Sequence, residues 1–498
     1  MNRRKKLYLN TTTAILNQIV VLVCGFILPR YILAYFGSDI NGLVTSMTRF
    51  LSVISFLELG IGPVIQSNLY KPLANNDADM ISKIVVSAEK FYRKIAYIFV
   101  LYIAVLMVIF PRINSDYDFW FTASLLLIIS ISTFAQYYFG ITYQVFLNAD
   151  QKVYVHTIVQ IITTILNTFL CVLMMKLGCG LHIVKLASAV VFIARPLVQN
   201  TYVKKHYKIN HKITFTEEPI KQKWNGFAQH LASVVCSEID VVLLTFFSTY
   251  QSVSIYSIYL LVVSGINKLV MTAVSGLESF WGNIMAKKEY YLLKKTFEVV
   301  ESLIHAGVTF LFIVTAILIA PFVSVYTKGI NDAAAYYLPL FGILLTLAYG
   351  VQCLRVPYFR IIKAAGHYKE TQKGAFISML LNIIFSITLI FKFQLVGVAI
   401  GTLVAMLYHT IYFAWYLRKN ILNRPFNHFV KHMVVDIIVG VLSFLATGWL
   451  RMGITTYGDW IIYAVIVAVI VGVITFALNL LLYKDEFIYL IRKVLKCT

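Results

Sequence analysis

Long apolar stretches, each long enough to cross a lipid bilayer, recur along the whole chain. A membrane-spanning helix needs about 20 mostly apolar residues, whereas a barrel strand alternates over about ten. The length and continuity of these stretches therefore predict helices. The predicted spans are residues 10–34, 41–68, 92–111, 118–145, 153–176, 181–203, 225–247, 252–282, 299–327, 332–360, 371–391, 395–417, 431–451 and 459–483. The predicted fold class is an all-α polytopic membrane protein with about 14 transmembrane helices.

The composition agrees with a protein embedded in a bilayer. Charged residues make up 13% of the chain, about half of the roughly 25% usual in soluble domains. The net charge of +21 would suit nucleic acid. However, the basic residues lie in loops between apolar spans and form no basic face, so we expect no nucleic-acid partner. The six cysteines form no CxxC pair, and we predict no metal site.

The placement of Lys and Arg predicts the orientation of the chain in the membrane. Most basic loop residues fall on one set of alternating segments, which includes both ends of the chain. The opposite set holds only Arg112, Lys176, Lys328, Lys392 and Arg451. Because basic loops stay in the cytoplasm, both termini are predicted to be cytoplasmic. The apolar run after MNRRKK is too long for a signal peptide and lacks an Ala-x-Ala exit, which indicates a retained first helix.

No loop is long enough to fold into a catalytic domain. The longest, residues 204–224, is a polar connector, and the chain contains neither GxxxxGK[ST] nor HExxH. We therefore expect a protein that is not an enzyme.

A faint internal repeat predicts two matched halves. FLNADQKVYVHTIVQIITTILN, ending at Asn167, aligns with IIKAAGHYKETQKGAFISMLLN, ending at Asn382. Six spans per unit is an even number, so both halves share one orientation, as in transporters built from parallel repeats. The predicted organisation is an N-lobe (1–203), a cytoplasmic linker (204–224), a C-lobe (225–420) and a C-terminal segment with two extra helices and a cytoplasmic tail (421–498). The two six-helix lobes would face a central cavity.

Charged residues inside the spans mark the candidate site. The hairpin Leu28–Pro63 carries Arg30 in one apolar limb and Arg49 in the other. An arginine at the centre of a spanning helix costs about 2.5–3.5 kcal/mol, so the two predict a water-filled cationic cavity. The alternatives are snorkelling to headgroups or pairing with an acid. The other cations inside spans are Lys185, Arg195, Lys268 and Arg355, against the acids Glu58, Glu238, Asp240 and Glu278.

Three features together resemble a known family. They are FLELGIGPVIQSNLYKPLA in the second span, the Y-x-x-x-x-NADQK-x-Y turn after the fourth, and the layout of six, six and two spans. They resemble the Wzx-type lipid-linked oligosaccharide flippases of the multidrug/oligosaccharidyl-lipid/polysaccharide exporter superfamily. The resemblance implies alternating access that moves an undecaprenyl-diphosphate-linked oligosaccharide across the bacterial cytoplasmic membrane, for O-antigen of lipopolysaccharide, capsule or exopolysaccharide. The implied partners are that cargo, membrane lipids, and a polysaccharide polymerase with its chain-length machinery.

The resemblance also implies which cations bind the diphosphate. The family's cavity takes cations from spans one, two and eight, which correspond here to Arg30, Arg49 and Lys268. Arginine suits a diphosphate because its planar fork donates two parallel hydrogen bonds. Arg195, directly before Pro196, and Arg355, two residues before Pro357, complete the candidate substrate-binding set, since each proline can bend its helix. Arg355 could instead mark the headgroup edge.

A coupling ion, Na⁺ or H⁺, is the one cofactor-like group that the resemblance implies. Related transporters bind a cation between spans seven and eleven, where this chain has Glu238, Asp240 and Asn382. Residues 238 and 240 lie about 200° apart around a helix, so both cannot face one ion. The alternative is an internal salt bridge, for instance with Lys268. His156, His230, His305 and His409 would form either a proton relay or ordinary polar contacts between helices.

Two other functions stay open. A multidrug/cation antiporter of the same superfamily predicts a less cationic cavity with an acid at its centre. A membrane polysaccharide polymerase or ligase predicts a long outside loop with Arg and His. The last two spans would either hold the polyprenyl tail or simply pack against the bundle.

Overall fold

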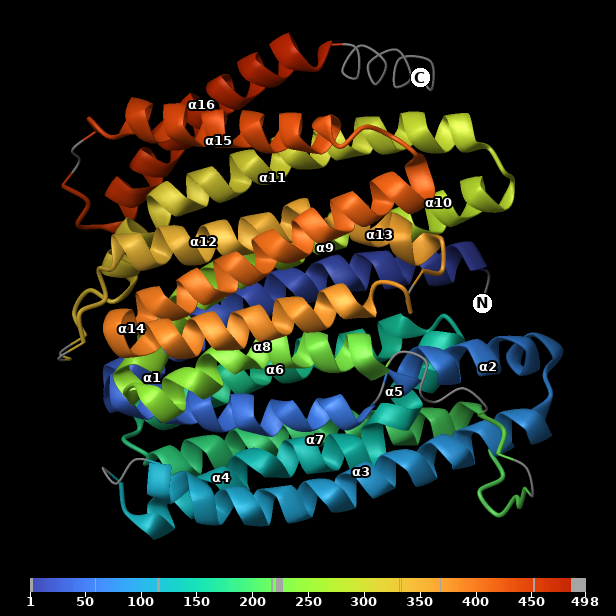
Figure 1. The fold of residues 1–498 in the computed structure, drawn as a ribbon. Coiled ribbons are helices and arrows are strands. Elements are labelled where there is room, and N and C mark those ends of the chain that lie inside the picture. Colours follow the sequence, from blue (N-terminus) through green and yellow to red (C-terminus); the bar gives the residue numbers. More distant parts are fainter. Residues whose placement is uncertain are drawn as a thin grey trace. The chain divides into compact units, whose positions relative to one another are not determined.

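The computed structural model describes residues 3–58, 60–113, 117–215, 218–220, 227–330, 332, 334–367, 369–450 and 453–484. The side chains of residues 3, 4, 227–230, 232 and 233 are outside this description. Every regular element in the described part is a helix (Figure 1). Eleven of these helices are long and apolar enough to span a membrane. The predicted all-α polytopic fold is therefore confirmed.

The chain forms two compact units, residues 1–246 and 247–498, which are described separately. The elements of unit 1 are α1 (Arg3–Val53), η1 (Ile54–Glu58), α2 (Ile61–Asn75), α3 (Ala78–Ile113), α4 (Phe119–Ala135), η2 (Gln136–Gly140), α5 (Ile141–Ala149), α6 (Val153–Lys176), α7 (Leu181–His206) and α8 (Phe227–Phe247). The elements of unit 2 are α9 (Tyr250–Ala273), α10 (Leu277–Ala286), α11 (Tyr290–Tyr326), α12 (Pro339–Leu354), α13 (Val356–Ala364), α14 (Gln372–Leu417), η3 (Arg418–Leu422), α15 (Asn427–Thr447) and α16 (Tyr457–Leu482).

Two of the longest helices are interrupted inside. Helix α1 has non-helical dihedral angles at Gly37 (φ 81°), and α14 has them at Gln394 (φ 47°). Each interruption falls in a gap between two predicted spans. The count of about 14 membrane helices nevertheless stays a prediction.

Unit 1 is a bundle in which α6 and α7 form the centre. Helix α1 packs along α6, α6 along α7, and α4 contacts both α3 and α7. Helices α3 and α4 lie side by side in Figure 1. The segment from α4 through the π-helix η2 to α5 approaches α7 closely at Gly140, where an added Cβ would lie 2.8 Å from Pro196 Cβ. This close approach packs the backbone of η2 against α7.

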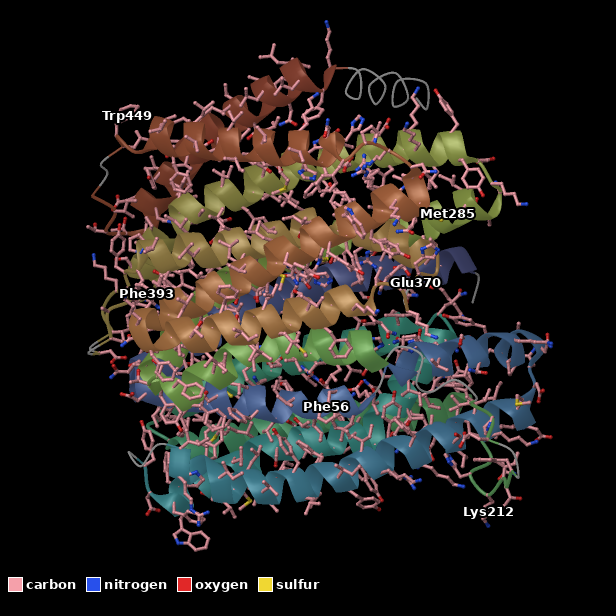
Figure 2. The ribbon with its side chains drawn as sticks, in the orientation of Figure 1. Phe56, Lys212, Met285, Glu370, Phe393 and Trp449 are labelled. Carbon is pink, nitrogen blue, oxygen red and sulfur yellow. The ribbon has the colours of Figure 1, made fainter. Side chains whose placement is uncertain are left out.

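Unit 2 is built around α11 and α12. Helix α12 packs against α9, α11 and α14, while α15 and α16 pack against α11. The two halves of α14 form a tight antiparallel hairpin, because an added Cβ at Gly401 would lie 2.2 Å from Ser386 Oγ. An aromatic core that includes Trp281, Phe297 and Tyr358 fills one end of the unit. Trp449 and Phe393 are 72% and 45% exposed near the helix ends on the left of Figure 2, as is usual for aromatic residues at a membrane interface.

The units do not coincide with the predicted lobes, whose boundaries stay predictions. The C-lobe was expected to begin at residue 225, whereas α8 groups with unit 1. The grouping has a local cause, because Thr245 on α8 donates a hydrogen bond to Ser46 on α1 (2.7 Å). Part of the predicted linker (216, 217 and 221–224) and the tail from residue 485 lie outside the described residues.

Candidate functional site

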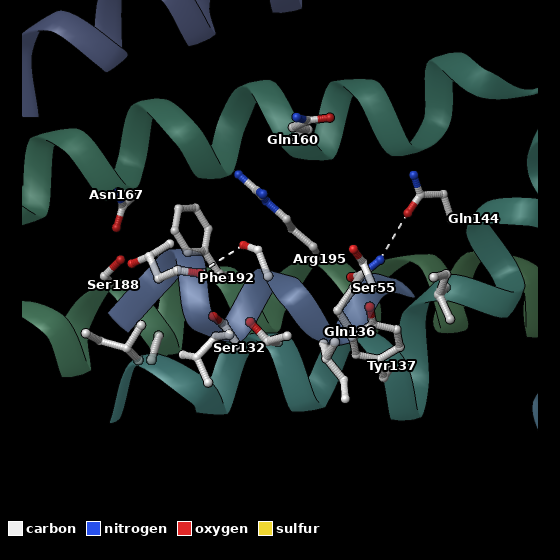
Figure 3. A pocket seen from close by; sticks show the side chains of 18 of the residues that line it. Ser55, Ser132, Gln136, Tyr137, Gln144, Gln160, Asn167, Ser188, Phe192 and Arg195 are labelled. Atoms are coloured by element: carbon white, nitrogen blue, oxygen red, sulfur yellow. Dashed lines mark hydrogen bonds between the residues drawn. The ribbon is translucent and has the colours of Figure 1, made fainter. Parts of the chain in front are cut away.

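A polar cavity of about 770 Å³ lies within unit 1 (Figure 3). Its walls come from α1, η1, α4, η2, α5, α6 and α7. The polar residues that line it are Thr48, Ser52, Ser55, Glu58, Ser132, Thr133, Gln136, Tyr137, Gln144, His156, Gln160, Asn167, Lys185, Ser188, Arg195 and Gln199. Polar groups inside a membrane-spanning bundle are costly unless they serve a water-filled space or a ligand, so this cavity is the candidate site.

Arg195 extends from α7 across the cavity towards α6 (Figure 3). Its Nε donates to Thr163 Oγ1 (2.7 Å) and its Nη2 to Thr164 Oγ1 (2.9 Å), while the guanidinium carbon lies 4.2 Å from the centre of the Phe192 ring. Among the described residues it forms no ion pair with a carboxylate. The two threonines therefore fix the guanidinium in place without neutralising its charge.

Lys185 is the second cation of the cavity, ten residues before Arg195 on the same helix. This spacing corresponds to about 15 Å along the helix axis. Lys185 forms no hydrogen bond or ion pair with any other described residue. Its ammonium group is therefore available to an anion, and sequence reasoning noted this lysine but did not include it in the site.

Glu58 is the one carboxylate among the described lining residues. It is the last residue of η1, the short helix that follows α1, and it accepts a hydrogen bond from Tyr137 Oη (2.7 Å). Next to Tyr137, the amide of Gln136 donates to Gln144 Oε1 (3.0 Å; dashed in Figure 3). With two cations against one acid, the lining is cationic on balance.

Two lining residues present polar atoms that have no hydrogen-bond partner within the described part of the protein. They are Oε1 of Gln199, a side chain that is only 4% exposed, and Nδ1 of His156. Buried polar atoms are nearly always hydrogen-bonded. These two atoms are therefore positions where water or a polar ligand would bind.

Of the five predicted substrate-binding residues, Arg195 alone is among the lining residues of this cavity. Arg49 lies one residue after the lining residue Thr48, and its Nη1 donates to Glu238 Oε2 on α8 (3.2 Å). The Arg49 side chain is 32% exposed and that of Glu238 14%. Glu238 thus has Arg49 as its partner. Arg30 is partly buried on α1.

The other two predicted cations belong to unit 2. Lys268 is exposed on α9. Arg355 lies at the junction of α12 and α13, where its guanidinium contacts His409 Nδ1 and, at 3.8 Å, Met406 Sδ. Neighbouring Arg360 pairs with Glu278 at 3.1 Å.

The predicted coupling-ion residues divide between the two units. Asp240 is buried on α8 in unit 1, and Asn382 is fully buried on α14 in unit 2, where its amide donates to Thr402 Oγ1 (3.2 Å). Within the described residues, no group of three or more His, Cys, Asp or Glu side chains could hold a metal ion. An ion site that joins Asp240 and Asn382 stays a prediction. Of the predicted histidines, His230 has its side chain outside the described part.

The NADQK turn, one of the features of the resemblance, joins three elements of unit 1. Asp150 lies 3.1 Å from the ammonium nitrogens of both Lys6 and Lys152, and it accepts a hydrogen bond from Tyr207. Burial acts to raise the pKa of Asp150, but the hydrogen bonds from Tyr207, Lys152 and Lys6 hold it below its ordinary value. The turn therefore fixes the start of α1 and the end of α7 to the loop between α5 and α6.

The chain matches no protein-family profile and no curated protein sequence. Its fold is similar to that of several solved transporters. The lipid II flippase MurJ in an inward-closed conformation has a TM-score of 0.71 and 16% identity, over 96% of this chain and all of MurJ. An inward-facing multidrug-resistance transporter of the MATE family has a TM-score of 0.57 and 12% identity, over 81% of this chain and 96% of its own. The eukaryotic MATE transporter AtDTX14 has a TM-score of 0.54 and 14% identity, over 86% and 99%. At these low sequence identities, the structural matches show a shared fold alone.

Proposed function

We propose that this protein is a flippase of the multidrug/oligosaccharidyl-lipid/polysaccharide exporter superfamily. Its cargo would be an undecaprenyl-diphosphate-linked oligosaccharide, carried across the bacterial cytoplasmic membrane by alternating access for O-antigen, capsule or exopolysaccharide synthesis. The observation that carries the proposal is the pair of cations, Lys185 and Arg195, in a polar cavity inside a membrane-spanning unit. The fold supports it, because the similar MurJ protein is described as a lipid II flippase.

The lining chemistry of the cavity suits the polar part of such a cargo. A diphosphate binds best to arginine and lysine, and Arg195 is already oriented by its two threonine contacts. Sugar hydroxyl groups suit amide and hydroxyl side chains such as Gln160 and Ser188. A volume of about 770 Å³ falls within the range of ordinary ligand pockets. Arg30, Arg49, Lys268 and Arg355 remain proposed contacts for other stages of the cycle.

The apolar tail of the cargo needs a different surface. Helices α15 and α16 carry exposed apolar side chains, for example Leu445, Val469 and Phe476. These side chains suit either lipid or a polyprenyl chain. We further propose cytoplasmic termini, as the basic loops predict, and coupling to Na⁺ or H⁺.

A multidrug/cation antiporter is the second candidate function. Glu58, an acid within the cavity, favours this candidate, as does the fold shared with the MATE transporters. An organic cation at Glu58 would, however, share the cavity with Lys185 and Arg195, whose charges repel it. The flippase is therefore the better supported of the two.

Polymer export in cells tests the proposal. In a strain that lacks the chromosomal copy, Lys185→Gln combined with Arg195→Gln should abolish outer-leaflet delivery of the lipid-linked sugar without reducing the amount of protein in the membrane. The matched control is Lys205→Gln, which removes an exposed charge from the end of the same helix and should deliver normally. Normal delivery by the double variant would overturn the proposal. Loss of resistance to cationic drugs in Glu58→Gln, with normal delivery of the sugar, would favour the antiporter.

A further inference from the structure

Unit 2 encloses a cluster of charged and titratable side chains that the proposed transport cavity does not use. Glu301 and His305 come from α11, Arg424 from the segment before α15, and His432 from α15, and each is at most 5% exposed. Asp436, also on α15, has a 10% exposed side chain. The two helices lie side by side (Figure 1). So many buried ionisable groups are costly unless their charges and hydrogen bonds match.

One half of the cluster is centred on Glu301. Arg424 donates to both carboxylate oxygens, through Nη1 to Oε2 at 2.5 Å and through Nη2 to Oε1. Tyr358, on α13, donates its hydroxyl hydrogen to Oε1 (2.7 Å). The single hydrogen of this phenol is therefore used by Glu301.

The other half is centred on His305. Its Nδ1 lies 2.6 Å from Asp436 Oδ2, and its Nε2 lies 3.1 Å from the hydroxyl oxygen of Tyr358. The second oxygen of Asp436 accepts a hydrogen bond from Thr309 (2.7 Å). His305 thus makes one contact with each of two oxygen atoms.

These contacts fix the number of protons. Tyr358 has given its hydrogen to Glu301, so its oxygen accepts and Nε2 of His305 must donate. Ionised Asp436 can only accept, so Nδ1 must donate as well. An imidazole with hydrogens on both nitrogens is a cation. A neutral His305 would leave one of these contacts between two acceptors with no hydrogen between them.

The charges lead to the same count. With His305 protonated, the two acids Glu301 and Asp436 are matched by the two cations Arg424 and His305. Without that proton, one negative charge stays buried and uncompensated, which is strongly unfavourable. If the proton moved from His305 Nδ1 to Asp436, the net charge of the cluster and its number of bound protons would stay the same.

We propose that this cluster is a proton-binding site, in which one proton on His305 joins Asp436 of α15 to Tyr358 of α13. Its ligand is a hydrogen ion, and its binding does not depend on the proposed cargo. Because the proton completes contacts among α11, α13 and α15, its loss weakens the attachment of α15 to the rest of unit 2.

Further titratable and charged groups surround His305. The ring of His432 stacks on His305 with centroids 4.7 Å apart, and its Nε2 lies 3.8 Å from Glu301 Oε2. Nδ1 of His432 has no hydrogen-bond partner among the described residues. His432 also stacks on buried Tyr483 (centroids 4.4 Å apart), and Lys431 Nζ lies 4.4 Å from the centre of the Tyr483 ring. Glu298, also on α11, is a further acid, and its negative charge attracts the Arg424 guanidinium.

Nitrogen-15 NMR of full-length protein labelled at histidine tests the site in detergent or nanodiscs. At about pH 8 an unperturbed histidine is neutral, yet one signal should retain the shift of an imidazolium with both nitrogens protonated. This signal should disappear in His305→Gln. It should persist in the control His428→Gln, which removes an exposed histidine of the same unit.

A second pair of variants guards against misfolding of His305→Gln. Asp436→Asn removes the negative charge beside Nδ1 of His305, and Tyr358→Phe removes the oxygen that accepts from Nε2, each with little change in shape. The signal should therefore titrate at lower pH in both variants. Absence of an imidazolium signal at about pH 8 in the unaltered protein would overturn the proposal. Persistence of that signal in His305→Gln would overturn it too. Neither readout involves a sugar or a lipid, so failure here is distinct from failure of the transport proposal.

Discussion

Arg49 on α1 and Glu238 on α8 form an ion pair across 3.2 Å, although 189 positions separate them in the chain. Both residues were candidates from the sequence, the arginine for the cargo and the glutamate for a coupling ion. Their pairing links the two candidate roles. An anion that binds Arg49 would compete with Glu238, and a cation that binds Glu238 would release Arg49.

The first prediction separates these roles. Arg49→Gln should strongly reduce sugar delivery, whereas Glu238→Gln, which leaves Arg49 without its acid, should retain it. Because the arginine side chain is 32% exposed, the pair should contribute no more than about 1 kcal/mol to stability. A double-mutant cycle on thermal unfolding measures the coupling energy. Normal delivery by Arg49→Gln would contradict a role for Arg49 in binding the cargo.

The second prediction concerns the shape of the Arg195 side chain. Arg195→Lys keeps the charge but cannot reach both Thr163 and Thr164 while it covers Phe192. Delivery should fall by about tenfold or more, as expected for a site that depends on the planar fork. The control is Arg112→Lys, which changes an exposed arginine at the end of α3 in the same way. Full activity of Arg195→Lys would show that charge alone is sufficient.

The third prediction is an acid-dependent loss of stability through Asp150. Since the pKa of this group is lower in the folded protein, its contribution is complete above the ordinary aspartate value of about 3.9. The contribution is lost as the pH falls through the folded value. Asp150→Asn should lower the free energy of unfolding at neutral pH by about 1–3 kcal/mol. It should also flatten the acid limb, the part of the pH curve in which the free energy of unfolding falls as the pH drops. Thermal unfolding between about pH 3 and pH 7 checks both effects; an unchanged acid limb in the variant would contradict the assignment.

The fourth prediction compares two glycines within helices. Gly401→Ala would place its Cβ 2.7 Å from the backbone nitrogen of Ser386 as well as 2.2 Å from its hydroxyl, so the halves of α14 must separate. We expect a loss of about 1–3 kcal/mol, which Ser386→Ala would not restore. Gly307→Ala on α11 meets nothing within 4 Å and should stabilise by up to about 1 kcal/mol. Melting temperatures in detergent decide the comparison, and similar values for the two variants would argue against the tight hairpin.

The sequence was sufficient for the fold class because burial in lipid dictates long apolar helices. It also placed the gaps that contain Gly37 and Gln394. The site was only partly predictable. Arg195 stands out as an arginine beside a proline in a span, but that it faces a cavity depends on the rotation of α7 against α6.

Ion pairs between residues far apart in the chain could not be predicted from the sequence. Glu301 and Arg424 are 123 positions apart, and nothing in either local pattern indicates the other. Lys185 was visible as a lysine within a span. What marks it as part of the site is the absence of an acid beside it among the described residues, which depends on tertiary packing.

The reversal of α14 at Gln394 has a practical consequence for topology mapping. Because a single residue turns the chain, an epitope tag or reporter domain inserted there would separate two helices that touch a few residues away. One substituted residue, such as Gln394→Cys at this exposed position, would leave the hairpin closed. Labelling of that thiol with an impermeant maleimide would then report which side of the membrane the turn occupies.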